Sequence, residues 1–312
     1  MKFSYNTLAA ALLSTLSVSA FAGDVSIYGK ANLTVQSSDS EDGSFTEVKS
    51  NASRIGFMGG QALDDDLEVI FKAEYQVDLA GDKNGSKDDD IVARNQYLGV
   101  KGKFGTVLLG KNDTVLKQSQ GKVDLFSDLN GDIKTLWKGE NRMSDTITYK
   151  SPKFNGFQVG VTYITEDAVD AEDGTSIALF YGDKALKKSD YYAAVALDSE
   201  VNGYDTMRLT VQGKVAGVTL GAIAHTQEKV SDGSEVDGFL VSAKYSIDKI
   251  TLKAQLQTAE LDGGEDRSGM TIGADYKLGK STKAFAFFTT FDLDMDSAED
   301  YDYLAVGLEY KF

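Results

Sequence analysis

The sequence predicts an all-β protein, a transmembrane antiparallel up-and-down β-barrel of about sixteen strands. Three observations predict this fold. Apolar and polar residues alternate with a period of two in segment after segment, which is the spacing of side chains on the two faces of a strand. The 312 residues include a single proline, as expected where most backbone N–H groups join a β-ladder. Beyond the N-terminus, no stretch approaches the roughly 18 apolar residues that a membrane-spanning helix needs.

The alternation is clear at both ends of the chain. In residues 25–36, Val25 and Ile27 lie on one face and Lys30 on the other, and residues 302–312 repeat the pattern. A soluble β-sandwich would show the same alternation, because it buries its apolar face in a core, so the sandwich remains an alternative. The barrel is favoured because the polar face carries large charged and amide side chains, as a wet interior requires. Short and long connections also alternate along the chain, as do the short periplasmic turns and the longer external loops of such a barrel.

The strands follow one another from the first alternating segment to the last residue. An even number of them would put both chain ends on the same side. Two segments have a mixed pattern. Leu98 and Val100 fall on the polar face of 91–101, as expected for burial against another subunit, and Phe285 and Phe287 compete with Phe288 for the outer face. The predicted strands are 25–36, 52–60, 67–78, 91–101, 104–111, 145–151, 156–164, 174–182, 190–198, 205–215, 217–226, 236–247, 249–260, 268–278, 283–292 and 302–312.

The composition excludes several classes of protein. The formal net charge is -16, so the surface repels polyanions, and we expect no binding to nucleic acid. The chain has no cysteine, which removes disulfides, thiol nucleophiles and Cys-ligated metal sites. A single histidine, His225, leaves little for imidazole-based catalysis or metal binding. We therefore expect no enzyme activity, no cofactor and no bound metal.

The first 22 residues have the layout of a secretory signal peptide. Lys2 is followed by an apolar stretch over 8–16 and by Ala20-Phe21-Ala22, a small-x-small cleavage signal before Gly23. We expect residues 1–22 to be removed and residues 23–312 to form a single β-barrel domain. An exported chain without a membrane-spanning helix is either soluble or spans a membrane as a barrel.

One connection is much longer than the others. About thirty residues, 112–144, separate two predicted strands, which is uncommon for a loop without a function. This segment holds the only tryptophan, Trp137, and mixes apolar residues such as Phe126 with several carboxylates. Apolar residues would anchor a loop that folds inward against the barrel wall, with its carboxylates facing the lumen. A cap resting on top of the barrel is the alternative.

Several short motifs, in their order and spacing, resemble the general diffusion porins of Gram-negative outer membranes. They are Val25-Ser26-Ile27-Tyr28-Gly29-Lys30, Ser53-Arg54-Ile55-Gly56-Phe57, Arg94-Asn95-Gln96-Tyr97-Leu98-Gly99-Val100, Phe104-Gly105-Thr106, Gly110-Lys111, Asn141-Arg142, Tyr149 and the terminal Phe312. The resemblance covers the whole mature chain. It implies a sixteen-stranded barrel, usually a homotrimer, whose long third external loop folds into the lumen.

The resemblance also implies a constriction at which basic side chains of the wall face carboxylates of the loop. By matching position, the wall residues are Lys30, Arg54, Arg94 and Arg142. The loop partners are chosen from Asp124, Asp128, Asp132 and Glu140, although the loop departs from the Pro-Glu-Phe-Gly-Gly pattern of enteric porins. Phe312 at the carboxyl end resembles the signal that barrel-assembly machinery recognises.

The expected function is passive diffusion of small hydrophilic solutes and ions through a water-filled channel in the Gram-negative outer membrane. The acidic excess predicts a weak preference for cations. Outer-membrane lipids including lipopolysaccharide are expected partners. Two alternatives remain: a substrate-selective porin, which would need an aromatic ladder along the lumen, and a receptor or adhesion barrel whose loops act and whose pore conducts little.

Overall fold

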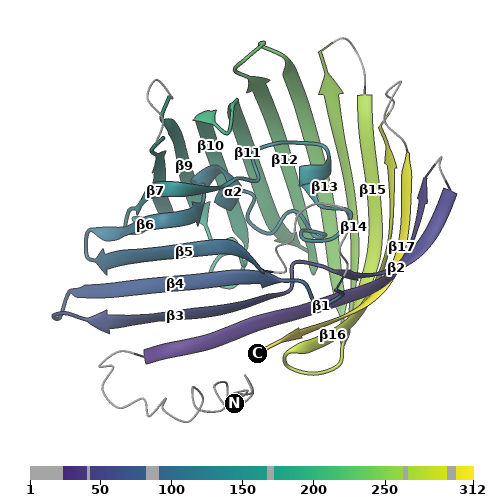
Figure 1. The fold of residues 1–312 in the computed structure, drawn as a ribbon, viewed down its shortest axis with the longest axis horizontal. Coiled ribbons are helices and arrows are strands. Elements are labelled where there is room, and N and C mark those ends of the chain that lie inside the picture. The colour runs from purple at the N-terminus through teal and green to yellow at the C-terminus, as the bar shows by residue number, and fades with distance from the viewer. Residues whose placement is uncertain (1–23, 41–42, 82–90, 167–171, 263–265, 294–299) are drawn as a thin grey trace, which may run out of the picture.

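The protein is built almost entirely of antiparallel strands that form one closed sheet (Figure 1). The computed structural model describes residues 24–40, 43–81, 91–166, 172–262, 266–293 and 300–312, so the predicted signal peptide lies outside the described residues. A short helix, α2 (Val115–Ser119), and a 3-10 turn, η1 (Ile133–Thr135), lie between β6 and β7. The strands are β1 (Asp24–Ser40), β2 (Gly43–Ser50), β3 (Arg54–Ala62), β4 (Leu67–Val77), β5 (Ile91–Gly102), β6 (Gly105–Asp113), β7 (Arg142–Lys150), β8 (Phe157–Ile164), β9 (Gly174–Gly182), β10 (Tyr191–Val201), β11 (Tyr204–Val215), β12 (Val218–Lys229), β13 (Glu235–Ile247), β14 (Ile250–Leu261), β15 (Asp266–Lys277), β16 (Thr282–Asp292) and β17 (Tyr301–Lys311).

The sheet closes where the first strand pairs with the last. β1 pairs with β17 along most of its length, from Lys30↔Lys311 to Asp39↔Asp302. On its other edge, β1 pairs with β2 through residues 33–40 and with β3 through residues 24–30. β2 and β3 are therefore two halves of one barrel strand, and the barrel has sixteen strands, as the sequence predicts. A closed single sheet also rules out the two-sheet sandwich.

The break between β2 and β3 is stabilised by side chains from the neighbouring strand. Asn51 Nδ2 donates to Thr34 Oγ1 at 2.9 Å, and Ser53 Oγ donates to the carbonyl oxygen of Asn32 at 3.2 Å. Between them, Ala52 has a positive φ of 49°. These contacts hold residues 51–53 in a turn, after which the strand resumes in a new direction at Arg54.

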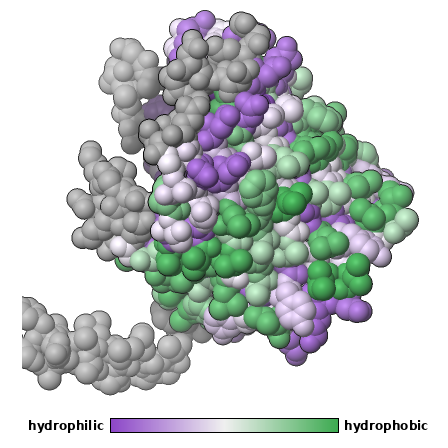
Figure 2. All heavy atoms as spheres, turned by 90° about the vertical axis from the view of Figure 1, so that its right-hand side faces the viewer, coloured by the Kyte–Doolittle hydropathy of each residue, from purple (hydrophilic) through white to green (hydrophobic). Residues whose placement is uncertain are grey.

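The two faces of the wall differ as the alternation predicts. Large apolar side chains such as Leu209 and Val211 are exposed on the outer surface, whereas Arg208 and Thr210, which alternate with them, point inward and are buried. Figure 2 shows apolar side chains gathered across the outer face, with hydrophilic residues above and below them. This outer surface suits the hydrocarbon of a bilayer. No helix in the described parts of the chain is long and apolar enough to cross a membrane.

The two segments with a mixed pattern have different explanations. The pairing of β4 with β5 shifts between Ala73 and Tyr75, so one extra residue of β5 bulges out and reverses the side-chain parity beyond it. Leu98 consequently lies on the outer face opposite Leu109, so the bulge accounts for the mixed parity without a second subunit. On β16, Phe285 and Phe287 point inward, where they are buried.

The predicted long connection runs between β6 and β7 over residues 114–141, shorter at both ends than the predicted 112–144, and it crosses the inside of the barrel (Figure 1). Three buried apolar clusters join it to different parts of the wall. Val115 and Leu116 pack against β9 and β10, and Phe126 packs against β16 and β17. Trp137 packs with residues of β12 to β14. The apolar core of this protein is therefore the contact between the β6–β7 segment and the wall.

Candidate functional site

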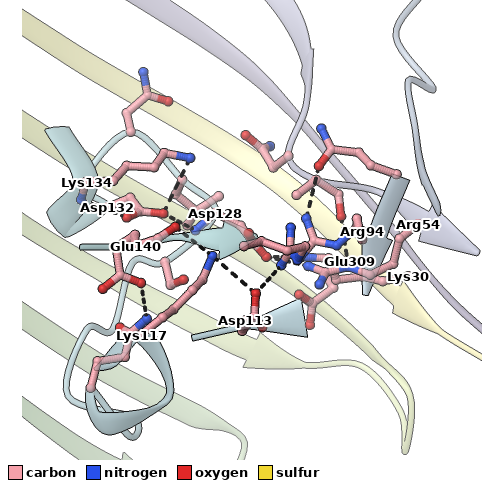
Figure 3. A pocket seen from close by; sticks show the side chains of 18 of the residues that line it. Lys30, Arg54, Arg94, Asp113, Lys117, Asp128, Asp132, Lys134, Glu140 and Glu309 are labelled. Carbon is pink, nitrogen blue, oxygen red and sulfur yellow. Dashed lines mark hydrogen bonds and ion pairs between the residues drawn. The ribbon is translucent and has the colours of Figure 1, made fainter. Parts of the chain in front are cut away.

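The β6–β7 segment and the facing wall enclose a cavity of about 1260 Å³ that is lined mainly by polar residues (Figure 3). One side of the cavity is formed by the segment, and the wall around it includes residues of β1 to β7, β16 and β17 and Lys184 of the turn between β9 and β10. Among the described residues, ten basic ones line it: Lys30, Lys49, Arg54, Arg94, Lys117, Lys122, Lys134, Arg142, Lys184 and Lys311. Six acidic ones from the same described ranges line it: Glu74, Asp113, Asp128, Asp132, Glu140 and Glu309.

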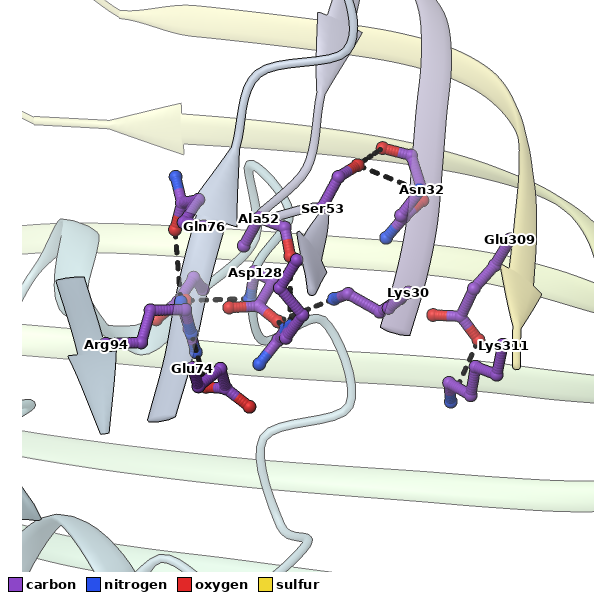
Figure 4. A network of polar contacts seen from close by, with 12 residues as sticks. Lys30, Asn32, Ala52, Ser53, Glu74, Gln76, Arg94, Asp128, Glu309 and Lys311 are labelled. Atoms are coloured by element: carbon purple, nitrogen blue, oxygen red, sulfur yellow. Dashed lines mark hydrogen bonds and ion pairs between the residues drawn. The ribbon is translucent and has the colours of Figure 1, made fainter. Parts of the chain in front are cut away.

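Asp128 meets two of the predicted wall residues. Its carboxylate accepts a hydrogen bond from Lys30 Nζ at 2.8 Å and pairs with Arg54 Nη2 (Figure 4). Lys30 and Arg54 lie side by side because they are register partners on β1 and β3. The Arg54 guanidinium is also held by the carbonyl oxygen of Ala52, which its Nε reaches at 3.1 Å. One loop carboxylate thus bridges two cations of the wall.

Arg94 has its partner on the wall, not on the loop. Its Nε donates to Glu74 Oε1 at 2.8 Å, and its Nη1 donates to Gln76 at 3.0 Å. Glu74 is buried, and its other oxygen accepts from the hydroxyl of Tyr28 at 2.7 Å. Arg94 is therefore fixed within a wall network that includes β1, β4 and β5.

Arg142 opens β7 and binds Asp113 at the end of β6 and Asn95 on β5. Its Nη2 lies 2.9 Å from Asp113 Oδ1, and its Nε donates to Asn95 at 2.6 Å. Asn95 in turn donates to Asp113 at 3.2 Å. Together with Lys30, Arg54 and Arg94, Arg142 lines one side of the cavity, so all four predicted wall residues lie on the same side.

The remaining predicted loop carboxylates have other partners, although Asp132 and Glu140 also line the cavity. Asp124 is buried and accepts from the backbone N–H groups of Phe126 and Ile133, so it shapes the segment itself. Asp132 caps η1 through the N–H of Lys134 at 3.0 Å. Glu140 pairs with Arg208 on β11, on the other side of the barrel. Of the four candidates, Asp128 alone has an ion pair with a predicted wall residue among the described residues.

Three charged residues of these networks were not singled out by sequence reasoning. Glu74 and Arg208 lie on the polar faces of clearly alternating segments, and Asp113 is the second residue after a predicted strand. Their inward position could be predicted from parity. Their partners could not, because each contact depends on the path of the β6–β7 segment or on the pairing of neighbouring strands.

The charge of the cavity differs from the charge of the whole chain. The formal net charge is -16, yet basic residues outnumber acidic ones along this cavity. The acidic excess of the chain, from which a weak preference for cations was predicted, is therefore not found along this cavity. Many acidic residues lie instead at the outer strand ends and turns, for example Asp173, Asp232 and Asp262. Within the described ranges, no group of three acidic or histidine side chains could hold a metal ion.

The C-terminal residue completes the closure of the barrel. The backbone of Phe312 exchanges hydrogen bonds with Gly29 on β1, with Gly29 N–H to Phe312 O at 2.9 Å. The Phe312 ring occupies the space beside Gly29, where an added Cβ would lie 2.3 Å from the ring. Its role as an assembly signal stays a prediction.

A closed barrel with an apolar outer surface and a charged cavity defines a membrane-spanning channel architecture. The chain belongs to the Gram-negative porin family, whose model matches residues 8–296. It is 26% identical to the major outer membrane protein P.IB of Neisseria gonorrhoeae, over 98% of this chain and 89% of that protein. Family membership and the barrel fold together assign the protein to the Gram-negative outer membrane.

Solved structures share the fold at low sequence identity. An anion-selective porin from Comamonas acidovorans matches with a TM-score of 0.79 and 17% identity, covering 93% of this chain and all of that one. A trimer form of the Vibrio cholerae outer membrane protein OmpT matches with a TM-score of 0.69 and 19% identity, over 93% of this chain and 100% of that one.

Proposed function

We propose that this porin forms a water-filled channel through which small hydrophilic solutes and ions diffuse passively. The contact that carries the proposal is the bridge from Asp128 to Lys30 and Arg54, because it brings a carboxylate of the loop against two cations of the wall within the lining of one polar cavity. In this proposal Lys30, Arg54, Arg94 and Arg142 form the wall of the constriction, and Asp128 faces them from the loop.

The mechanism needs no chemical step. Fixed cations on one side of a narrow passage and carboxylates on the other create a transverse field that orients water and polar solutes. An apolar solute must displace this oriented water without replacing its interactions, so it passes more slowly. Small hydrophilic molecules cross because they exchange one set of polar contacts for another.

The ion preference follows from the charges nearest to the passage. Whole-chain charge predicts a weak preference for cations, but the ten basic and six acidic residues of the cavity favour anions. Fixed charges act over about 10 Å at 0.1 M salt, so lining residues outweigh acidic loops at the mouth. We therefore propose a modest anion preference, like that of the anion-selective porin from Comamonas acidovorans.

We further propose that the mature chain begins at Gly23 after removal of the signal peptide and assembles as a homotrimer. Support for the trimer comes from the related fold of OmpT, of which a trimer form is described. Lipopolysaccharide and other outer-membrane lipids would contact the apolar outer surface. The barrel-assembly machinery would recognise the final strand and Phe312.

Single-channel recording in planar bilayers with a KCl gradient tests the channel. We expect stepwise ohmic currents and a reversal potential displaced toward that of chloride. Arg54→Ala and Arg142→Ala should each raise conductance, since each removes a bulky side chain from the lining, whereas Lys229→Ala at an outer turn should leave it unchanged. Negligible current from folded protein would contradict the proposal and favour a receptor or adhesion barrel. A reversal potential displaced toward that of potassium would show a preference for cations instead.

A further inference from the structure

Five lysines at one end of the lumen have no carboxylate partner. This is the end with the short turns, which faces the periplasm in porin barrels. Within the described ranges, no Asp or Glu oxygen lies within ion-pair distance of any of these ammonium groups. We call them the inner lysine cluster: Lys122 of the β6–β7 segment, Lys150 at the end of β7, Lys184 in the turn between β9 and β10, Lys214 on β11 and Lys244 on β13.

Lysines on the neighbouring part of the wall are neutralised. Lys253 Nζ on β14 lies 3.0 Å from Asp275 Oδ1, and Lys283 Nζ on β16 lies 2.9 Å from Asp275 Oδ2. Lys253 is the direct register partner of Lys244 across β13 and β14. Two lysines in adjacent positions therefore differ in whether a carboxylate is paired with them. The missing partners are a property of the inner lysine cluster, not of every lysine that points into the lumen.

Lys150 is held by uncharged groups. Its Nζ donates to the side-chain oxygen of Gln118 and lies 5.8 Å from the centre of the Phe180 ring. Asp113 attracts the Lys150 charge, but its carboxylate is already paired with Arg142 at 2.9 Å. An ammonium group has three N–H donors, so two of those of Lys150 remain for water or an anion.

Lys184 adds to the unbalanced positive charge. Among the neighbouring cations, it repels both Lys122 and Lys150 most strongly. The adjacent Asp183 does not neutralise it, because the Asp183 carboxylate accepts hydrogen bonds from three backbone N–H groups of its own turn. Like charges that are close together destabilise one another, and an opposite charge between them relieves the repulsion. These three lysines therefore favour a bound anion.

The lysines line a recess beside the main cavity. The recess has a volume of about 240 Å³, and Lys150 and Lys184 are among the residues that line it. Gln118 and Lys184 line both the recess and the main cavity, and Lys122 lines the main cavity. A solute that has passed Asp128 and the basic wall therefore finds this recess at the edge of its path.

We propose that Lys122, Lys150 and Lys184 form a binding site for a compact, doubly charged oxyanion of the phosphate type. Ammonium groups only donate hydrogen bonds, and a tetrahedral oxyanion has acceptor oxygens in several directions, so it can bond to cations that come from the segment, from β7 and from a turn. A chloride ion carries one charge and compensates less of the repulsion. The site names solutes with a free phosphate group as a substrate class of the proposed channel.

Chemical labelling of the lysines tests the site without any variant and without a working channel. Full-length mature protein, folded in a phosphate-free detergent at about pH 7.5, where a phosphate group is mostly doubly charged, is acetylated briefly with N-hydroxysuccinimidyl acetate. Mass spectrometry measures the rate at each lysine in inorganic phosphate and in chloride of equal ionic strength. We expect phosphate to slow the acetylation of Lys150 and Lys184 several-fold and to leave Lys229 at an outer turn unchanged. Equal rates in the two salts, or equal slowing at Lys229, would overturn the proposal.

Variants separate a site from a general effect of positive charge. Lys150→Gln should abolish the protection of Lys184 by phosphate, whereas Lys150→Arg keeps the cation and should retain most of it. The control Lys283→Gln also removes one lysine of the wall, but its partner Asp275 stays paired with Lys253, so protection should equal that of the wild type. Undiminished protection of Lys184 in Lys150→Gln, or an equal loss in Lys283→Gln, would overturn the site.

Current recordings connect the site to transport, and this arm alone rests on the proposed channel function. Phosphate added in KCl on the side of the short turns should reduce the chloride current. Lys150→Gln should need a several-fold higher phosphate concentration for the same reduction. Absence of any current before phosphate is added would count against the channel, whereas the labelling would still decide the site. An equal reduction in Lys150→Gln and the wild type would overturn the part of the site in transport.

Discussion

The carboxylate of Asp128 lies 2.8 Å from the ammonium nitrogen of Lys30, although 98 residues separate them in the chain. Asp128 also has a positive φ of 70°, a conformation that Asp and Asn tolerate better than other residues with a side chain. The long segment therefore presents this carboxylate to the wall from a turn in which Asn can replace Asp without added backbone strain.

Asp128→Asn should increase the preference for anions. The substitution keeps the turn but removes the charge that neutralises part of Lys30 and Arg54. One unit charge at about 4 Å in water is worth about 1 kcal/mol, so the chloride-to-potassium permeability ratio should rise by up to about fivefold at low salt. Reversal potentials in a KCl gradient measure this ratio. The same ratio in the variant and the wild type would remove Asp128 from the ion pathway.

Two neighbouring residues of β3 test which face contacts lipid. Phe57 lies on the outer face, and Met58 points into the lumen, since it pairs with Lys72 on β4. Phe57→Arg should lower the free energy of unfolding by about 2–4 kcal/mol, the cost of a cation on the lipid face near the bilayer midplane. Met58→Arg should have a much smaller effect. Urea unfolding midpoints in lipid vesicles compare them, and equal losses would contradict the assigned faces.

The parity of most strands could be predicted from the sequence because each strand separates lipid from water. The predicted strand pattern was wrong where an irregular residue changes the face on which the following side chains lie or interrupts the strand. The bulge in β5 moves Leu98 to the outer face, and the break at residues 51–53 depends on Asn51 and Ser53 bonding to β1. Both features arise from pairing with a neighbouring strand, which local sequence does not encode.

The same limit applies to the candidate site, where the inward position of a charged residue could be predicted but its partner often could not. Lys30 and Arg54 could be placed inward from alternation and matched motifs, and both meet Asp128. Arg94 instead bonds to Glu74 across the wall, and Glu140 bonds to Arg208. The partner of each charge depends on the course of an irregular segment, whose direction is fixed by where its apolar side chains find pockets on the wall.

The turn between β9 and β10 predicts a specific acid sensitivity. The pKa of Asp183 is lowered to about 2 because its carboxylate accepts hydrogen bonds from the backbone N–H groups of Ala185, Lys188 and Lys187. A carboxylate with a lowered pKa stabilises the fold above its ordinary value of about 3.9 and loses this effect as pH falls toward 2. Protease cleavage of this turn should increase over that range. In Asp183→Asn the turn should be cleaved more easily at neutral pH, and its cleavage should depend less on acid. The control Asp190→Asn, in the same turn, should show neither change.

Phe126 is expected to be the main apolar anchor of the β6–β7 segment. It is fully buried against Phe285 and Phe287, and Lys253 Nζ lies 4.6 Å from the centre of its ring. A Phe→Ala change in a packed core costs about 3–5 kcal/mol. The barrel ladder does not depend on this contact, so the loss should loosen the segment and leave the strands intact.

Phe126→Ala should therefore give noisier single-channel currents and faster proteolysis within residues 112–144, with barrel unfolding close to that of the wild type. Leu125→Ala is the matched control, because Leu125 is the adjacent residue and only partly buried. Arg208 and Trp137 hold the opposite end of the segment, so Phe126→Ala should leave the emission of Trp137 nearly unchanged. A large change in the emission of Trp137 would mean that the segment detaches as one unit. Current noise and proteolysis rates equal to those of the wild type would instead show that the hydrogen bonds of its backbone with Gln255 and Ser242 suffice to hold it.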